Sequence, residues 1–259
     1  MRIIIPMTGH GSRFKSAGYS KLKPFIRVHG KPILFWVCKM FPNYKIEIII
    51  RDFHAKKYSY VVREIKKFCK NIEIHKVKSW KKKGPAYDVC NYLNKDNRLQ
   101  EPVMVSYCDF YALWDIEKFN KLIKKNDPDG VIPCYTGFHP HLLHPENLYA
   151  TCKSDKNHKM IKIQEKHQMH ACKFNDLTSP GLYYFKTGEL CKKYCNKLIN
   201  SKQSINNEYY MSLPFNFMVQ DNLTVLTPPI VNFFCQWGTP ADLEEYIFWN
   251  TKSFLKNYD

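Results

Sequence analysis

The stretch RIIIPMTGHGSRF, residues 2–14, joins a short apolar run to a glycine-rich turn. Gly9 and Gly11 flank one residue, and a serine and an arginine follow at once. Glycine permits positive φ and a close approach of the backbone to a ligand. A strand that leads through such a turn into a helix directs backbone N–H groups at a bound phosphate. The turn matches neither the dinucleotide fingerprint G-x-G-x-x-G nor the ATPase loop G-x-x-x-x-G-K-[ST], so alone it fits either a phosphate loop or a flexible turn.

The first half of the chain alternates apolar runs with helix-like stretches. We expect strands over 2–6, 45–51, 72–77, 102–107 and 129–135, and helices over 31–41, 55–70, 85–94 and 115–126. Asp115 is the predicted N-cap of the last of these helices. Near-continuous apolar strands between helices indicate a parallel sheet that is covered on both faces.

The second half is less regular. Its expected strands cover 149–153, 159–166, 181–186, 222–229 and 231–237, and its expected helices cover 187–200, 207–220 and 239–250. Pro240 follows Thr239 at a first helical position, where proline is well tolerated. No repeat or linker interrupts the pattern. We therefore predict one α/β domain over 1–259, with three layers, α/β/α, around a mixed, mostly parallel sheet.

Composition limits the class of protein. The chain has 259 residues, of which 44% are hydrophobic, and its net charge is +17. No apolar run reaches the length of about 18 residues that a membrane span needs, and no secretory signal is visible, so we expect a soluble, cytoplasmic protein. The charge favours a polyanionic partner. Its lysines are spread along the chain, with short runs at 66–67 and 81–83, and no nucleic-acid motif matches, so we expect no nucleic acid and no membrane as partner.

The ten cysteines show no tight pairs, and most lie in apolar segments, which predicts reduced structural thiols in place of disulfides or metal ligands. The histidines of GFHPHLLH (137–144), His139, His141 and His144, have a spacing that can suit a metal. No acidic residue or cysteine stands beside them, which favours a plain or substrate-facing loop.

The segment SKLKPFIRVHGKPIL (20–34) changes the interpretation of the glycine turn. G-x-G-S-R followed by K-P-F-I-x-V-x-G-K-P resembles the N-terminal signature of the sugar-phosphate nucleotidyltransferases, the pyrophosphorylases with a Rossmann-like, glycosyltransferase-A-like fold. The resemblance implies that the loop wraps a nucleoside triphosphate and that Arg13 and Lys23 are catalytic, stabilising the transferring and leaving phosphates. The matching loop residues are Gly9, His10, Gly11, Ser12 and Arg13, with the side chain of His10 expected to face solvent.

Further matches follow in chain order. KKKGPAYDV (81–89) resembles the family's segment that contacts the base, which implicates Gly84, Pro85 and Ala86. VMVSYCDF (103–110) is an apolar strand that ends in Asp109, where the family binds Mg²⁺ and where an open α/β sheet places ligands. IQEKH (163–167) resembles the family's E-K-P, which implicates Glu165 and Lys166 in binding the acceptor. SPGLYYF (179–185) adds Gly181, and Glu208 is a further candidate for the acceptor.

The resemblance extends to QWGTPADLEEY (236–246), where Gln236 replaces the family's second metal-binding aspartate. An uncharged amide should bind Mg²⁺ more weakly than a carboxylate does. The other departure, His167 for the proline of E-K-P, puts the local turn in question. The resemblance implies a nucleotide-binding half over about 1–135 and an acceptor-binding half over about 136–259.

The implied activity is transfer of NMP from an NTP to a sugar 1-phosphate, which forms an NDP-sugar and releases pyrophosphate with Mg²⁺ as cofactor. Three alternatives stay open: a cytidylyltransferase that acts on a non-sugar phosphomonoester, a catalytically weak nucleotide-binding homologue, and, on charge alone, a nucleic-acid-binding protein. The sequence does not identify the base, the acceptor or the oligomeric state.

Overall fold

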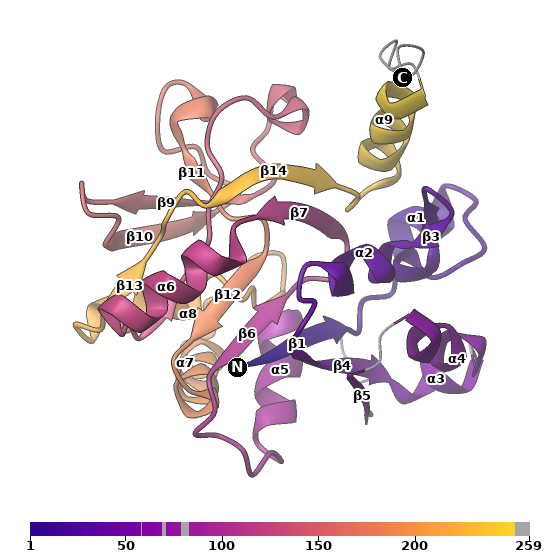
Figure 1. The fold of residues 1–259 in the computed structure, drawn as a ribbon, viewed down its shortest axis with the longest axis horizontal. Coiled ribbons are helices and arrows are strands. Elements are labelled where there is room, and N and C mark those ends of the chain that lie inside the picture. Colours follow the sequence, from indigo (N-terminus) through magenta and orange to yellow (C-terminus); the bar gives the residue numbers. More distant parts are fainter. Residues whose placement is uncertain (58, 69–70, 79–82, 252–259) are drawn as a thin grey trace.

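A seven-stranded sheet forms the centre of the computed structural model, which describes residues 1–57, 59–68, 71–78 and 83–251 (Figure 1). The strand order is β13 (Val225–Leu226), β8 (Gly130–Val131), β12 (Leu182–Phe185), β6 (Val103–Ser106), β1 (Arg2–Met7), β4 (Lys45–Arg51) and β5 (Ile72–Val77). β6, β1, β4 and β5 run parallel, whereas β12 is antiparallel to both of its neighbours. The prediction of a mixed, mostly parallel sheet is confirmed.

The two faces of β1 explain the three layers. Side chains alternate between the faces of a strand, and Ile3 and Ile5 belong to one hydrophobic cluster while Ile4 belongs to the other, all three fully buried. The first cluster includes residues of α2 (Ile33–Lys39) and α6 (Ile116–Asn126). The second includes residues of α5 (Pro85–Leu93), α7 (Gly188–Asn200) and α8 (Pro214–Gln220). Helices thus cover both faces, as the apolar strands predicted.

Three smaller sheets complete the structure. β9 (Ala150–Ser154) lies between β10 (Met160–Glu165) and β11 (Leu177–Thr178), and β2 (Arg27–Val28) pairs with β3 (Lys31–Pro32). β7 (Phe110–Trp114) pairs antiparallel with β14 (Val231–Gln236). The sequence interpretation missed β7, because it ended the preceding strand at Asp109 and did not recognise FYALW as a strand of a different ladder.

The remaining helices are α1 (Ser12–Ser16), α3 (Asp52–Lys57), α4 (Ser59–Phe68) and α9 (Pro240–Thr251). Asp115 caps α6 by accepting a hydrogen bond from the Lys118 N–H at 2.7 Å, and Pro240 opens α9, as predicted. The helix expected over 207–220 begins only at Pro214. Residues 205–209 instead make backbone hydrogen bonds outside any helix, to one another and to Lys83.

α9 lies beside α1 and β3, far along the chain from them (Figure 1). The Tyr19 hydroxyl donates to Glu244 at 3.4 Å, and His29 contacts Tyr246 at 3.1 Å. Among the described residues, no helix has the length and apolar character that a membrane span requires.

Candidate active site

The glycine turn forms the wall of a cavity of about 290 Å³ at the carboxyl edge of the central strands. Gly11 has φ of +62° and immediately precedes α1, so the turn takes a conformation that glycine adopts at little cost. Residues 6–14 line the cavity together with residues from the ends of β4 and β6. The structure therefore brings the predicted loop residues to one concave site.

Lys23 and Asp109 form an ion pair in this site, with Nζ and Oδ2 2.7 Å apart. Lys23 begins a 3-10 turn and Asp109 follows β6, and their side chains are only 21% and 28% exposed. Burial alone would lower the pKa of the ammonium, but the charge of Asp109 and the hydrogen bond it accepts from Nζ act in the opposite direction, and the net pKa of Lys23 is raised. Lys23 is therefore a cation at neutral pH.

At Gly84 the chain packs closely against residues 208 and 209, which are distant in sequence. Its φ of +91° suits glycine, and a Cβ at this position would lie 2.5 Å from the Tyr209 nitrogen and 2.7 Å from the Tyr209 oxygen. The Tyr209 N–H donates to the Lys83 carbonyl at 2.8 Å, and the Ala86 N–H donates to the Tyr209 carbonyl at 3.0 Å. Glu208, which the sequence assigned to the acceptor, consequently lines this first cavity and not the second. Lys81 and Lys82 of the predicted base-contacting segment lie outside the described residues.

A second cavity of about 210 Å³ adjoins the first. The two share six lining residues: Arg13, Lys23, Tyr107, Asp109, Tyr210 and Gly238. Of the residues that the sequence assigned to the acceptor, Glu165, Lys166 and Gly181 line the second cavity, as does Gln236. The Lys23–Asp109 pair therefore stands where the two cavities meet.

Glu165 is the last residue of β10, and Lys166 follows it; both line the second cavity. Ser212 donates a hydrogen bond to the Glu165 carboxylate, and burial raises the pKa of Glu165 to about 7 against the opposing effects of Ser212 and Lys166. Lys166 has φ of +54°, and its Nζ lies 6.0 Å from the centre of the Tyr210 ring. His167 closes the turn without the family's proline, because its carbonyl accepts from Thr151 Oγ1 at 2.5 Å and from Asn147 Nδ2 at 2.6 Å.

Gly181 positions an aromatic ring. It has φ of +108°, and a Cβ there would approach Tyr107 Cδ2 to 2.9 Å. The Tyr107 N–H donates to the Gly181 carbonyl at 3.0 Å, and the Tyr107 hydroxyl accepts from the Met211 N–H at 3.1 Å. The absence of a side chain at Gly181 thus leaves room for Tyr107 at the boundary between the cavities.

Gln236 lies next to Asp109 because β14 pairs with β7, a strand that the sequence did not predict. In the β7–β14 ladder Gln236 pairs with Phe110, and the Trp237 N–H donates to the Asp109 carbonyl at 3.2 Å. Gln236 Nε2 donates to Asp242 at 3.4 Å. The side chains of Gln236 and Asp109 both lie close to Gly238. A Cβ added at Gly238 would lie 2.7 Å from Gln236 Nε2 and 3.6 Å from Asp109 Oδ2.

These residues fit Mg²⁺ only together with a bound nucleotide. One carboxylate, already paired with a lysine, and one neutral amide make a poor cage for a divalent cation. Mg²⁺ is commonly held by one or two carboxylates together with substrate phosphates and water. Asp109 would therefore suit a divalent cation only where phosphate groups and water supply the other ligands.

Sequence reasoning missed a polar group in the first cavity. Thr8 Oγ1 donates to Asp88 Oδ2 at 2.5 Å, and Arg51 Nη1 lies 3.0 Å from His10 Nε2. The side chain of His10 is exposed, as expected, and it also contacts Arg51. Arg51 could have been predicted as a site residue from its position at the end of a parallel strand, because ligand sites form at that edge of the sheet.

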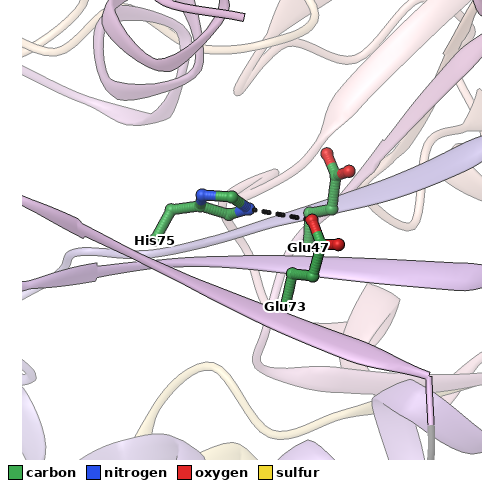
Figure 2. Close-up of side chains that lie close together, drawn as sticks. All are labelled: Glu47, Glu73 and His75. Carbon is green, nitrogen blue, oxygen red and sulfur yellow. Dashed lines mark ion pairs between the residues drawn. The ribbon is translucent and has the colours of Figure 1, made fainter. Parts of the chain in front are cut away.

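Figure 2 shows a cluster of two glutamates and a histidine outside the two cavities: Glu47, Glu73 and His75. Glu47 accepts from Arg2 at 3.0 Å and pairs with Arg98 at 3.0 Å, and Glu73 pairs with Lys45 at 2.6 Å. These cations compensate the carboxylates. Arg2, which pairs with Glu47, is the first residue of β1, whereas the glycine turn lies after the last residue of that strand. The cluster is thus an ion-pair network distant from the cavities.

The other cysteine and histidine candidates also carry structural contacts. No disulfide joins any two of the nine cysteines in the described part of the chain, and seven of them are buried; Cys69 lies outside the described residues. His141 lies 2.7 Å from the Tyr135 hydroxyl, His139 packs on the Tyr135 ring, and His144 Nδ1 accepts from the Glu146 N–H at 3.2 Å.

The architecture is that of an α/β protein with two joined cavities at the carboxyl edge of its central strands. Comparison with solved structures then identifies the fold: the chain has the fold of the sugar nucleotidyltransferases. No protein-family model matches the sequence, and no curated protein matches it.

Three solved structures illustrate the likeness. A nucleoside-diphosphate-sugar pyrophosphorylase from Vibrio cholerae superimposes with a TM-score of 0.73 at 20% identity, covering 95% of this chain and 99% of the other. A UDP-glucose pyrophosphorylase in complex with UDP-glucose gives 0.72 at 12% identity, covering 97% and 99%. A Bacillus anthracis protein described as a glucose-1-phosphate thymidylyltransferase, in complex with sucrose, gives 0.71 at 14% identity, covering 97% and 96%.

Proposed function

We propose that this chain is a nucleotidyltransferase that transfers NMP from an NTP to a sugar 1-phosphate, with Mg²⁺ as cofactor. The observation that carries the proposal is the meeting of two cavities at one ion pair, Lys23–Asp109. A reaction between two polyanions needs two adjacent sites and a cationic boundary between them. The fold's solved neighbours, one of which holds UDP-glucose, support the same reaction class.

In this reaction an oxygen of the acceptor phosphate attacks the α-phosphorus of the NTP. A new P–O bond forms, the bond from the α-phosphorus to the bridging oxygen breaks, and pyrophosphate leaves with that electron pair. A phosphate monoester dianion is a competent nucleophile at neutral pH, so no general base is required. The protein has to align the two substrates and stabilise the developing charge.

The chain's own residues have distinct tasks in this proposal. The glycine turn and Arg13 bind the β- and γ-phosphates, Lys23 stabilises charge at the α-phosphate, and Lys166 binds the acceptor phosphate. Asp109 would hold Mg²⁺ together with the nucleotide, and a bound metal would supply positive charge to the phosphates there. Residues that carry hydroxyl groups, Ser179, Thr239 and several tyrosines, are among those that line the second cavity, which supports a polyhydroxylated acceptor.

Pyrophosphate release is the direct test. ATP, GTP, CTP, UTP and dTTP are each combined with sugar 1-phosphates and with non-sugar phosphomonoesters, including phosphorylated alcohols. Release with a sugar 1-phosphate supports the proposal, and release only with a non-sugar acceptor replaces it with the cytidylyltransferase alternative. Retained NTP binding without release for every pair would indicate a non-catalytic homologue.

Lys23→Ala should lower the rate by about 10²–10³-fold, the effect of removing one preorganised electrostatic donor. Lys21→Ala is the matched control, because Lys21 is exposed two residues earlier and lines neither cavity. Equal rates for the two variants would contradict the role of Lys23.

A further inference from the structure

The last turn of α9 carries three consecutive exposed apolar residues. Ile247, Phe248 and Trp249 are 40%, 52% and 61% exposed. Successive residues of an α-helix are turned by about 100°, so three in a row cover too wide an arc to lie on one packed face. The helix is held through its earlier residues, since Leu243 is fully buried and Tyr246 is half-buried. In Figure 1 this end of α9 projects from the body, as an interaction surface does.

α9 is also the acidic part of a basic protein. Between Pro240 and Thr251 it has three acidic residues and no lysine or arginine, whereas the rest of the chain has 40 basic and 20 acidic residues. Glu244 and Glu245 are exposed, and among the described residues no lysine or arginine forms an ion pair with either of them. The helix therefore suits a basic surface that can also contact an aromatic ring.

A groove of about 550 Å³ lies beside the first half of this helix. Its lining consists of residues 17–21, Ile26, Arg27 and Glu244. The Arg27 side chain is 51% exposed, although Nη1 donates to the Gly30 carbonyl at 2.8 Å and Nη2 lies 3.8 Å from Glu64. Apart from Glu244, the lining comes from residues 1–46, which include nine lysines and arginines and no acidic residue. The groove is thus complementary in charge to α9.

We propose that the end of α9 enters this groove on a second copy of the chain, so that two copies form a symmetric dimer. Trp249 contacts the Arg27 guanidinium of the other copy, where an indole ring attracts a cation. Trp249 does not line the groove of its own chain, because it lies five residues, about 7.5 Å along the helix axis, beyond Glu244. Each copy offers both a helix end and a groove, so the interface is isologous and closes at two copies.

The size and charge of this interface predict how the dimer behaves. One helix end and one groove from each copy place it at the small end of specific interfaces, so we expect reversible association with a Kd of about 1–100 µM. Salt screens the attraction between the acidic helix and the basic groove, so the Kd should rise severalfold between about 0.05 M and about 0.5 M NaCl. A Kd that does not rise with salt would overturn this charge-matched interface.

Sedimentation velocity of the full chain between about 1 and about 200 µM measures the association. Trp249→Ala and Arg27→Glu should each raise the Kd by about tenfold, through loss of the contact between the ring and the cation. Phe53→Ala is the matched control, because Phe53 is 60% exposed and has Lys57 Nζ 5.8 Å from its ring centre, but lies in α3. It should leave the Kd unchanged. Circular dichroism confirms that each variant is folded.

Photo-crosslinking identifies the surface that α9 contacts. A benzophenone amino acid placed at position 249 should crosslink to residues 17–27 of another copy, and mixing isotopically labelled with unlabelled chains distinguishes this product from a crosslink within one chain. A protein that is monomeric up to about 200 µM would overturn the inference, as would an equal loss of association in Phe53→Ala. Crosslinks confined to single chains would also overturn it. No substrate takes part in these measurements, so their outcome is independent of the proposed activity.

Discussion

Replacing Gly84 with alanine tests how residues 208–210 pack against the wall of the first cavity. The backbone of Gly84 has φ of +91° and ψ of 167°, a region that is essentially reserved for glycine and costs other residues about 1–3 kcal/mol. The new Cβ would also lie 2.5 Å and 2.7 Å from the Tyr209 backbone nitrogen and oxygen. Backbone atoms at such distances cannot turn aside as a flexible side chain can, so overpacking adds about 1–3 kcal/mol.

These two contributions predict that Gly84→Ala lowers the free energy of unfolding by at least about 2 kcal/mol, which corresponds to a fall in Tm of at least about 4 °C for a domain of this size. If the segment of Tyr209 shifts to relieve the clash, Glu208 and Tyr210 move with it. Both line the first cavity, so NTP affinity should fall as well.

Gly137→Ala is the matched control, because Gly137 lines neither cavity. Gly137 also has positive φ, +86°, but a Cβ there meets no atom within 4 Å, so this variant carries backbone strain without overpacking. Differential scanning calorimetry gives Tm, and isothermal titration gives the Kd for an NTP. A Gly84→Ala protein with wild-type Tm and wild-type Kd would refute the reasoning, since it would mean that Tyr209 does not pack against this backbone.

Three further substitutions test the junction. Asp109→Asn should reduce Mg²⁺-dependent pyrophosphate release by about 10²–10³-fold with the fold retained by circular dichroism, and full activity would remove Asp109 from the metal site. Gln236→Asp should lower the Mg²⁺ concentration for half-maximal rate and, because it adds a charge beside Asp109 and Asp242, should lower Tm in EDTA; an unchanged Mg²⁺ requirement would show that position 236 is not a ligand. Glu165 has a folded-state pKa of about 7, above its ordinary value of 4.5, so the folded protein holds this proton more tightly and its stability should fall as pH rises from about 4.5 to 7, by at most about 3 kcal/mol. Glu165→Gln should flatten that part of the pH–stability curve measured by urea unfolding, and an unaltered curve would contradict the raised pKa.

The sequence predicted those parts of the molecule that local patterns determine. The apolar run before Gly9 became the central strand, and Asp109 stands at the carboxyl end of a parallel strand, where a lone carboxylate after an apolar run was expected. The Asp115 cap followed from a side chain that bonds a backbone three residues away. In each case the decisive partners are close in sequence.

The parts that could not be predicted depend on partners far apart in the chain. β7 exists because residues 231–236 pair with it, and nothing in FYALW identifies that partner. Thr8 and Asp88 meet only because α5 packs against the end of β1. Arg51, at the end of β4, contacts His10, which follows the neighbouring strand β1. The late start of α8 has the same cause, since Tyr209 makes its backbone hydrogen bonds with residues 83 and 86.

The place of β6 in the sheet has a consequence for synthesis on the ribosome. β6 pairs with β1 on one side and with the much later β12 on the other, and Gln236 reaches Asp109 only when β14 has paired with β7. About 125 residues separate the end of β6 from the start of β14, and at roughly 5–20 residues per second they take about 6–25 s to translate. During this interval the nascent chain carries the glycine turn and Asp109 but has an open strand edge, a surface that binds other chains unless it is covered. β14 therefore completes both the β7–β14 ladder and the wall of the second cavity, so that a nascent chain gains its assembled junction only after residue 236 has been translated.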